Sequence, residues 1–308
     1  MSLGNKKIIL VTGSNRSGST WVGKVIDSRG DVDNIIEPLN PNRTKRFGLF
    51  KINYWYPRLV ADAERSAEVK EIESLFDYYL HDSLSHVKSL FRSYEGHGFL
   101  KSIKIRLRRN SRPIKLLKDP TALFAIPWLV QKYQVKPVVL IRHPAAYVLS
   151  IKEKNWWFDF NNFLRQENFF TGPMAELRHE VEAFKKHEKE MDIVANAALL
   201  WKVFYTQVKH YQECFPDWHF VTHEALSIET KKEFQKIFEF IELDLTPSVL
   251  NKINESTNAD SGEEAKHIRN AEENAVKWKH KLNDEERFKI KECTNELAVH
   301  FYGKYCWE

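Results

Sequence analysis

Residues 8–20 read IILVTGSNRSGST. The four apolar residues at the start, followed by Thr12 and Gly13, are typical of a strand that is buried on both faces of a parallel sheet. Small residues then lead into an expected helix over residues 19–28, whose apolar side chains share one face. This order of strand, loop and helix predicts an α/β fold with an anion-binding loop between its first strand and first helix.

The loop has the spacing G-x-x-x-x-G from Gly13 to Gly18, followed by Ser19 and Thr20. Backbone N–H groups of such a loop can point inward, and the start of the following helix adds partial positive charge, so the loop can hold a phosphate. A plain strand-to-helix turn is the other interpretation of the spacing alone. Ser19 stands where a Walker A loop has lysine, and Arg16 places a cation inside the loop instead. The loop therefore favours an anion shorter than ATP.

The rest of the chain alternates apolar runs with helical patterns. Strands are expected at residues 35–36, 114–117, 137–141 and 219–222. Helices are expected at residues 64–94, 121–133, from 144 onward, around 199–211 and at 283–302. Because strands that alternate with helices form parallel sheets with crossover helices, the sequence predicts a parallel sheet. No shift in composition marks a linker, so residues 1–308 are expected to form a single domain.

The composition excludes several classes of protein. The chain has 308 residues, of which 43% are hydrophobic, so it is neither disordered nor collagen-like. Its 47 basic and 42 acidic residues leave a net charge of +5, a mild bias that indicates a small anionic ligand and no nucleic acid. No run of about 18 apolar residues predicts a membrane-spanning helix. Cys214, Cys293 and Cys306 are too widely spaced for a disulfide framework or a cysteine-rich zinc site, so we expect a cytoplasmic protein without a metal.

A second motif ends the strand expected at residues 137–141. It reads Arg142-His143-Pro144, and Ser150 follows about two helical turns later. An arginine at that position lies at the carboxyl edge of the sheet, where α/β proteins bind nucleotides, and a guanidinium with a hydroxyl suits a terminal phosphate. Taken singly, Arg142 is better interpreted as a surface or helix-capping residue and Ser150 as a solvated one. The phosphate loop on the same chain favours the phosphate interpretation for both.

Together the two motifs resemble those of the sulfotransferases that use 3′-phosphoadenosine-5′-phosphosulfate (PAPS), most closely those of the carbohydrate type. The segment similar to the family's 5′-phosphosulfate loop consists of Arg16, Ser17, Gly18, Ser19, Thr20 and Trp21. Arg142, Pro144 and Ser150 are similar to its 3′-phosphate motif. The resemblance implies a P-loop-type three-layer fold with a central parallel sheet, helix-rich insertions that cover the acceptor side, and a single sulfotransferase domain over residues 1–308. It also implies PAPS as co-substrate, adenosine 3′,5′-bisphosphate as its product, and no metal.

Further segments are similar to the family, less specifically. Glu37 lies in a Glu-Pro segment like that of carbohydrate sulfotransferases. Lys118 and Asp119 lie where cytosolic relatives carry a lysine and a catalytic histidine. His223 stands in place of the tyrosine in the family's Tyr-Glu-Asp-Leu element, and Trp278 is similar to part of a late loop that covers the cofactor. By this resemblance His223 and Trp278 are cofactor contacts.

The resemblance implies transfer of a sulfuryl group from PAPS to an acceptor hydroxyl by in-line displacement, in which Arg16 neutralises charge on the leaving phosphate. The acceptor must lose a proton, so a carboxylate base is expected. Glu37, which follows a strand and precedes a proline, is the first candidate, and Asp119 is the second. Lys118 is a candidate contact for the transferring group or the acceptor. The alternatives are a surface carboxylate for Glu37 and a helix N-cap for Asp119, since Pro120 follows it.

The acceptor is predicted to be a small molecule or glycan, carbohydrate or lipid-like. Seven aromatic residues between 156 and 170 form either an acceptor lid or ordinary helical core. Residues 45–110 and 155–190 match no motif of the family. Two other functions are weighed: a P-loop nucleotide or small-molecule kinase, which the missing loop lysine disfavours, and a non-catalytic nucleotide-binding protein, which the full set of candidate site residues disfavours.

Overall fold

The computed structural model of the chain describes residues 6–43, 52–59, 67–80, 112–257 and 276–308. The backbone forms two compact units, Met1–Thr12 with Thr20–Pro137 and Gly13–Ser19 with Val138–Glu308. Each unit contains buried apolar side chains from its own strands and helices. The expected phosphate loop belongs to the second unit, although the strand before it belongs to the first.

Three parallel strands form the sheet of the first unit. They are β1 (Lys7–Gly13), β2 (Val32–Ile36) and β3 (Ile114–Lys118). β3 pairs with both of the others, because Ile114 lies opposite Lys7 on one side and opposite Val32 on the other. Every residue of β3 is buried, as expected for a strand with neighbours on both sides. The strands predicted from the apolar runs in this unit are confirmed.

β2 is longer than the two residues that the sequence predicts. Asp33 and Asn34 interrupt its apolar run, so the local pattern does not extend to Val32. Asp33 is nevertheless buried, because its carboxylate pairs with the Lys115 ammonium on β3 at 3.1 Å. Burial of a charge is tolerated when the charge is paired. A contact between residues far apart in the sequence therefore lengthens this strand.

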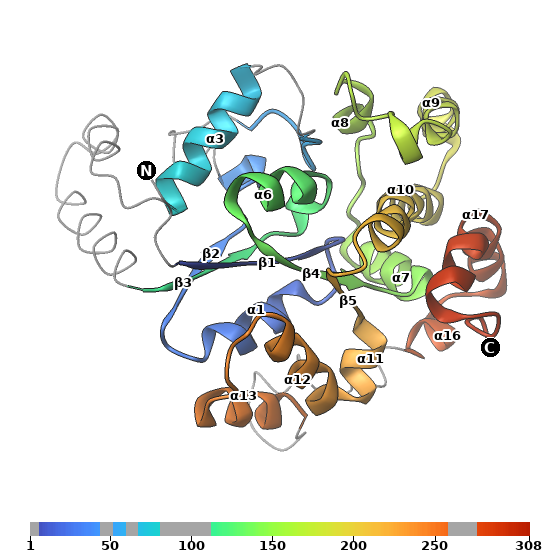
Figure 1. The fold of residues 1–308 in the computed structure, drawn as a ribbon. Helices are drawn as coiled ribbons and strands as arrows, with labels where there is room; N and C mark the ends of the chain where they lie inside the picture. The colour runs from blue at the N-terminus through green and yellow to red at the C-terminus, as the bar shows by residue number, and fades with distance from the viewer. Residues whose placement is uncertain (1–5, 44–51, 60–66, 81–111, 258–275) are drawn as a thin grey trace, which may run out of the picture. The chain divides into compact units, whose positions relative to one another are not determined.

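Helices cover both faces of the strands of the first unit. They are α1 (Ser19–Asp27), α3 (Ala67–Leu80), the 3₁₀ helix η2 (Pro120–Ala125) and α6 (Ile126–Tyr133). α3 and α6 lie on one face of β1–β3 and α1 on the other (Figure 1). The single helix expected at residues 121–133 is divided, because Pro127 in the first turn of α6 has no N–H with which to continue a helix from η2. Of the helix expected at residues 64–94, the part beyond Leu80 lies outside the described residues.

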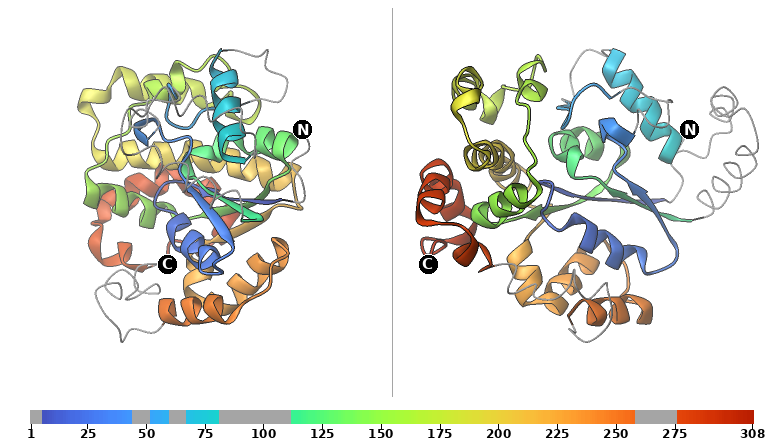
Figure 2. Two further views of the ribbon diagram at one scale, coloured as in Figure 1. Left: turned by 90° about the vertical axis from the view of Figure 1, so that its left-hand side faces the viewer. Right: turned by 180° about the vertical axis from the view of Figure 1, so that it is seen from behind.

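The second unit contains β4 (Lys136–Ile141), which enters it at Val138, and β5 (His219–Thr222). The two strands are parallel, with Val138 opposite His219. α10 (Ile193–Cys214) lies on one side of these strands and α12 (Thr230–Phe240) on the other (Figures 1 and 2). α10 packs against α7 (Pro144–Lys154) and α17 (Asp284–Tyr302), and α11 (His223–Ile228) packs against β5. The other helices of the unit are α8 (Asn161–Leu164), η3 (Gly172–Met174), α9 (Leu177–Lys186), η4 (Glu188–Glu190), α13 (Pro247–Thr257) and α16 (Trp278–Lys281).

The hydrogen-bonded order of the strands is β2-β3-β1-β4-β5. The pairs of β1 with β3, β2 with β3 and β4 with β5 are all parallel. Two pairs of neighbours, β3 with β1 and β1 with β4, are not consecutive in the chain. Parallel strands need crossover connections, which helices supply here. The predicted α/β class with a central parallel sheet between helices is confirmed.

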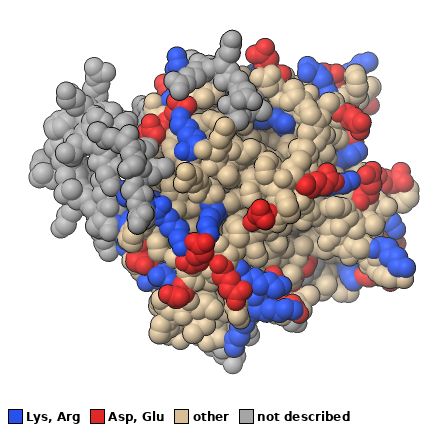
Figure 3. Space-filling view, viewed as in Figure 1, with Lys and Arg blue, Asp and Glu red and all other residues tan. Residues whose placement is uncertain are grey.

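Charged side chains of both signs are interspersed on the part of the face that Figure 3 shows in colour. The net charge of +5 does not gather into one basic field there. Cys214, Cys293 and Cys306 are free thiols. Within the described ranges, no helix combines the length and the hydropathy needed to cross a membrane.

Candidate functional site

The loop after β1 has positive φ angles that favour glycine at two of its positions. Gly13 has φ +143°, and a Cβ there would lie 2.4 Å from the carbonyl oxygen of Leu140. Gly18 has φ +99°, and a Cβ there would lie 2.8 Å from Cδ2 of His223. Arg16 is held at φ +67°, a left-handed conformation that costs a non-glycine residue about 1 kcal/mol or more. The G-x-x-x-x-G spacing is therefore required by the backbone.

Side chains of the loop fix its shape from inside. The Ser17 hydroxyl donates to the carbonyl of Ser14 at 2.6 Å, and the Ser17 N–H donates to the same oxygen at 3.2 Å. Asn15 accepts a hydrogen bond from the phenol of Tyr147 at 2.9 Å. Ser17 and Ser19 are buried, whereas Thr20 is exposed and Trp21 half-buried. Ser17 thus has a shaping role in the loop, and its own hydroxyl is already bonded.

The two predicted arginines and the predicted serine lie together in the second unit. Arg16 donates from Nε to the Ser150 hydroxyl at 2.8 Å, and Arg142 donates from Nη1 to the carbonyl of Arg16 at 2.5 Å. Burial lowers the pKa of Arg142 from its ordinary value; the Arg16 charge lowers it further, while Glu224 opposes both. The sequence predicts these residues at separate phosphates, and the structure joins them in one hydrogen-bonded cluster.

The cluster has unsatisfied capacity for an anion. The buried Nε of Arg142 has no hydrogen-bond partner among the residues that the structure describes. In the same described part, neither Arg16 nor Arg142 forms an ion pair with a carboxylate. Two neighbouring guanidinium groups repel each other, and a phosphate that accepts from both removes that repulsion. The residues present therefore fit a phosphate-bearing ligand.

His223 closes one side of the loop. Its ring lies against Gly18. His223 is the first residue of α11, and the Thr222 hydroxyl caps this helix because it accepts from the Ala225 N–H at 3.0 Å. Burial, with the charges of Arg142 and Arg16, lowers the pKa of His223 to about 3. The imidazole is thus neutral at physiological pH and lines the loop, a position compatible with the predicted cofactor contact and unsuited to a base at neutral pH.

Trp278 lies beside the turn that carries Arg142. Its indole is 3% exposed and stacks on the imidazole of His143. One face of the indole is thus covered by the protein itself. Trp278 therefore packs on the Arg142-His143 turn, and its contact with the cofactor stays a prediction.

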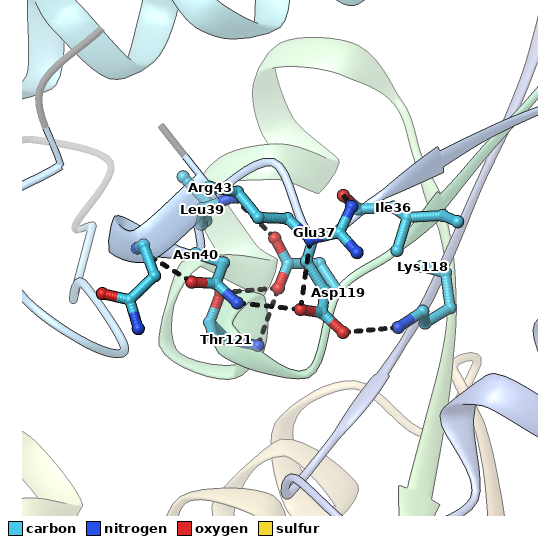
Figure 4. Close-up of polar contacts among 9 residues, drawn as sticks. Ile36, Glu37, Leu39, Asn40, Arg43, Lys118, Asp119 and Thr121 are labelled. Atoms are coloured by element: carbon cyan, nitrogen blue, oxygen red, sulfur yellow. Dashed lines mark hydrogen bonds and ion pairs between the residues drawn. The ribbon is translucent and has the colours of Figure 1, made fainter. Parts of the chain in front are cut away.

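In the first unit, Glu37 and Lys118 form an ion pair at the ends of β2 and β3 (Figure 4). Lys118 Nζ lies 2.6 Å from Glu37 Oε1, and Asn40 donates to Oε2 at 2.8 Å. Burial alone would raise the pKa of Glu37, but the hydrogen bond and charge of Lys118, the Asn40 bond and the Arg43 charge bring it below its ordinary value. Glu37 is therefore an ionised carboxylate whose oxygens retain lone pairs for one more donor.

Asp119 is fully buried and both of its oxygens are used (Figure 4). Oδ1 accepts from the backbone N–H of Thr121 at 2.8 Å and caps η2, and Oδ2 accepts from the N–H of Leu39 at 2.7 Å. Burial raises the pKa of Asp119 to about 6, although these hydrogen bonds oppose the rise. The geometry favours the N-cap alternative for Asp119 and leaves Glu37 as the more accessible carboxylate.

A model of the sulfotransferase domain matches residues 6–298. The chain belongs to the sulfotransferase family. Family membership selects sulfuryl transfer over the kinase and non-catalytic alternatives. Among the described residues of this sulfotransferase, no group of three or more His, Cys, Asp or Glu side chains is arranged to hold a metal ion.

The chain is similar to solved sulfotransferases, two of which share its fold. The sulfotransferase domain of the olefin synthase from Synechococcus PCC 7002 is 16% identical over 96% of this chain and 95% of that one, with a TM-score of 0.50. The sulfotransferase domain from the curacin biosynthetic pathway is 14% identical over 95% and 98% of the two chains, also with a TM-score of 0.50. Mouse sulfotransferase SULT7A1 complexed with PAP is 14% identical over 96% and 85%, with a TM-score of 0.44. No curated protein matches significantly.

Six of the seven aromatic residues between 156 and 170 divide into a buried and an exposed group, and the half-buried Phe158 packs on Phe160 and Phe163. Four are buried in the second unit of the sulfotransferase, namely Phe160, Phe163, Phe169 and Phe170. Trp156 and Trp157 are instead 47% and 42% exposed. The Arg16 guanidinium lies 5.8 Å from the centre of the Trp156 ring, a cation–π distance. Core packing is thus correct for the buried group, and the two tryptophans are the most exposed aromatic residues of this segment.

Sequence reasoning missed Tyr205 of α10. Its phenol lies 2.9 Å from the Ser14 hydroxyl and accepts from the Arg142 N–H at 2.9 Å, so it touches both phosphate motifs of the sulfotransferase. Tyr205 lies in a helix rich in buried aromatic and aliphatic residues. No sequence signal separates it from them, because the contact spans 191 positions of the chain.

Proposed function

We propose that this sulfotransferase transfers a sulfuryl group from PAPS to a hydroxyl of a carbohydrate or lipid-like small molecule, and releases adenosine 3′,5′-bisphosphate. The observation that carries the proposal is the Arg16–Ser150–Arg142 cluster, which joins two guanidinium groups and a hydroxyl without a carboxylate partner in the described residues. A nucleotide with phosphates at both 3′ and 5′ presents the anions that such a cluster needs. The family match over residues 6–298 supports one sulfotransferase domain.

In this proposal Arg142 and Ser150 bind the 3′-phosphate. Ser150 Oγ accepts a hydrogen bond from Arg16, so its own proton is available to donate to a phosphate oxygen. Arg142 is already held at its backbone and at Nη1, and its unpaired Nε is a further donor. Little side-chain freedom remains to be lost on binding, which favours affinity.

Arg16 and the start of α1 bind the 5′-phosphosulfate end. The N–H groups of Ser19 and Thr20 belong to the first turn of α1 and have no acceptor within the helix. When the acceptor oxygen bonds to sulfur, the bond between sulfur and the bridging phosphate oxygen breaks and leaves negative charge on the nucleotide. Arg16, together with these N–H groups, stabilises that charge without a metal.

Glu37 is the base that takes the proton of the acceptor hydroxyl. Its pKa lies below the ordinary value, so the carboxylate is ready to accept at neutral pH. Lys118 holds Oε1 at 2.6 Å and orients the carboxylate, and it also supplies positive charge for the transferring group. Asp119 positions the base indirectly, because its carboxylate accepts from the N–H of Leu39, two residues after Glu37. From the spacing of the three cysteines we also propose a cytoplasmic location.

Calorimetric titration with adenosine 3′,5′-bisphosphate, and separately with ATP and Mg²⁺, tests the proposal. The bisphosphate should bind the wild-type protein, and Arg142→Ala should abolish most of that binding. Arg178→Ala is the matched control, because Arg178 pairs with Glu182 on the exposed surface of α9. Binding of ATP with Mg²⁺ alone would overturn the proposal. Transfer from labelled PAPS to sugars and to long-chain alcohols then separates the two acceptor classes.

A further inference from the structure

Tyr205 connects the two elements that the proposed function assigns to the two ends of the nucleotide. We infer that Tyr205 is a positioning residue that sets the spacing between the 5′-phosphate loop, residues 13–19, and the 3′-phosphate residue Arg142. The inference rests on the proposed function. It concerns a residue of α10, an element that carries none of the predicted site residues.

The hydrogen-bond directions follow from the donors. The backbone N–H of Arg142 can only donate, so the phenol oxygen of Tyr205 accepts there at 2.9 Å. The phenol proton is then directed to the hydroxyl oxygen of Ser14, also at 2.9 Å. Burial raises the pKa of Tyr205 well above its usual range, so the phenol keeps this proton at every physiological pH. One hydroxyl thus serves both elements at once.

Each hydrogen bond of Tyr205 is linked to the proposed ligand-binding groups by one further hydrogen bond. Ser14 accepts at its carbonyl from both the hydroxyl and the N–H of Ser17, and these bonds close the turn of the loop. Arg142 is held at its carbonyl by the indole N–H of Trp201 at 2.8 Å, so α10 fixes both sides of that peptide position. Trp201 and Tyr205 are neighbours on α10, with ring centroids 4.5 Å apart. The helix therefore acts as a rigid spacer behind both sites.

Spacing matters because the ligand is itself rigid. The ribose fixes the separation of a 3′- and a 5′-phosphate, so a displaced pair of sites fits one phosphate at the expense of the other. A monophosphate is free to adjust to the single site that it uses. Loss of the spacer should hence weaken a bisphosphate more than either monophosphate, whereas a general loss of structure should weaken all three alike.

Three variants that each keep an aromatic ring separate the possibilities. Tyr205→Phe removes the contacts to both elements. Trp201→Phe removes the contact to Arg142 alone, and Tyr147→Phe removes a contact to the loop alone, at Asn15. Affinities for adenosine 3′,5′-bisphosphate, adenosine 5′-monophosphate and adenosine 3′-monophosphate are measured by calorimetry for each variant and for the wild type, with circular dichroism to verify folding.

For Tyr205→Phe we expect a Kd for the bisphosphate that is raised about tenfold or more, as the loss of two hydrogen bonds suggests, and monophosphate Kd values raised less than about threefold. Trp201→Phe should weaken the bisphosphate and the 3′-monophosphate to a similar degree and spare the 5′-monophosphate. Tyr147→Phe should weaken the bisphosphate and the 5′-monophosphate to a similar degree and spare the 3′-monophosphate. An equal loss for all three nucleotides in Tyr205→Phe, or no loss, overturns the inference. Failure of the wild type to bind the bisphosphate would instead overturn the proposed function.

Ser14→Ala provides a second route if Tyr205→Phe does not fold. It removes the acceptor of the phenol proton and leaves the ring and the Arg142 contact in place. The same selective loss of bisphosphate affinity is expected. If Tyr205→Phe does fold, its loss and that of Ser14→Ala should not add in the double variant, because both substitutions remove the hydrogen bond between Ser14 and Tyr205. Additive losses, or a Ser14→Ala protein with wild-type affinities, contradict the inference.

Discussion

The imidazole of His143 stacks on the indole of Trp278, with ring centroids 4.9 Å apart and 11° between the planes. Tyr302 and Trp307 approach the same imidazole edge-on, at 5.2 Å and 5.1 Å. His143 Nδ1 accepts from the Ala145 N–H at 3.3 Å, so the remaining proton is on Nε2, which donates to the carbonyl of Cys306 at 3.0 Å. A neutral histidine next to Arg142 is therefore held by residues near position 300.

We expect His143→Asn to weaken binding of adenosine 3′,5′-bisphosphate while the protein remains folded. Asparagine is a good N-cap and preserves the start of α7, but it loses the stack on Trp278 and the bond to Cys306. Arg142 then loses the support of its neighbour, and calorimetry should show a Kd raised about five- to tenfold, as expected for about 1 kcal/mol of lost positioning.

Trp307→Ala should act in the same direction, because Trp307 packs on the same ring. Trp218→Ala is the matched control, since Trp218 stacks on Phe215 at 4.3 Å in the loop before β5, and it should leave nucleotide binding unchanged. Wild-type affinity in His143→Asn would show that only the N-cap matters. Equal weakening by Trp218→Ala would show that any lost aromatic contact has this effect.

Stability should decline as the pH falls from about 6.5 toward 4.5. Burial lowers the pKa of His143 to about 4 and, with the charges of Arg142 and Arg16, that of His223 to about 3. Both residues have a pKa near 6.5 in the unfolded chain, so below that pH the unfolded state binds protons that the folded state excludes. Asp119 acts in the opposite direction: burial raises its pKa to about 6, so its contribution is lost as the pH rises through 6.

Burial also lowers the pKa of His219 and raises that of Glu224. Three histidines thus act against two carboxyl groups, so the melting temperature should fall with the pH. Scanning calorimetry between pH 7.5 and 4.5 measures the slope, which should be shallower in His143→Asn. His179→Asn is the control, because the His179 side chain is 93% exposed and its slope should match the wild type. A melting temperature that is constant over this range would contradict the buried, neutral state of the histidines.

The sequence predicts correctly those parts of the molecule whose conformation depends on residues that are close together in the chain. Three features are predicted at their observed positions: the strand at residues 8–11, the loop with its two glycines, and the Arg142-His143-Pro144 turn. In each of them the local residues determine the backbone conformation. The local pattern predicts β2 too short, because the burial of Asp33 depends on Lys115, 82 positions away. The residues around Asp33 in the sequence do not show that a lysine of another strand will pair with it.

The candidate site shows the same division. Arg16, Arg142 and Ser150 can be proposed as a set from spacing alone, yet the hydrogen bond between Arg16 and Ser150 joins residues 134 positions apart. For Asp119 the sequence allows a base or an N-cap, and the hydrogen bonds of its two oxygens to Thr121 and Leu39 favour the N-cap. The decisive property in each case is which lone pairs and protons are already used, and only the folded chain determines that.

Glu37→Gln should reduce transfer about 100-fold or more while the Kd for the bisphosphate stays within about twofold. Glutamine keeps the shape and an acceptor for Asn40, but it is unable to take a proton at neutral pH. Steady-state transfer from PAPS at saturating acceptor measures kcat, and calorimetry measures binding. Because the pKa of Glu37 is lowered, wild-type kcat should remain level down to about pH 5 and decline only below it.

Asp119→Asn is the comparison for Glu37→Gln, and it should fail in a different way. Its amide can accept at one oxygen only, so the N–H of Thr121 or of Leu39 loses its acceptor in a buried position. That loss costs about 1–3 kcal/mol of stability and should lower the melting temperature, with kcat of the folded enzyme largely retained. The reverse pattern, with transfer surviving Glu37→Gln and lost in a stable Asp119→Asn, would assign the base to Asp119.

Trp156→Ala should raise the KM for the acceptor and leave the Kd for the bisphosphate nearly unchanged. The Trp156 ring is half exposed and its face lies 5.8 Å from the Arg16 guanidinium, beside the group proposed to hold the transferring end of PAPS. An exposed cation–π contact is worth about 0.5–1 kcal/mol, so its loss alone changes nucleotide affinity less than about fivefold. A flat indole face suits the apolar side of a sugar ring as well as an alkyl chain, so the acceptor should be more sensitive than the donor. Trp157→Ala is the matched control, because Trp157 is exposed to a similar degree but is hydrogen-bonded to Glu188 at 3.1 Å and packs near Phe184 instead of Arg16. If both variants kept the wild-type acceptor KM, the exposed tryptophans would have no part in acceptor binding, whereas a selective effect of Trp156→Ala would place the acceptor against Arg16.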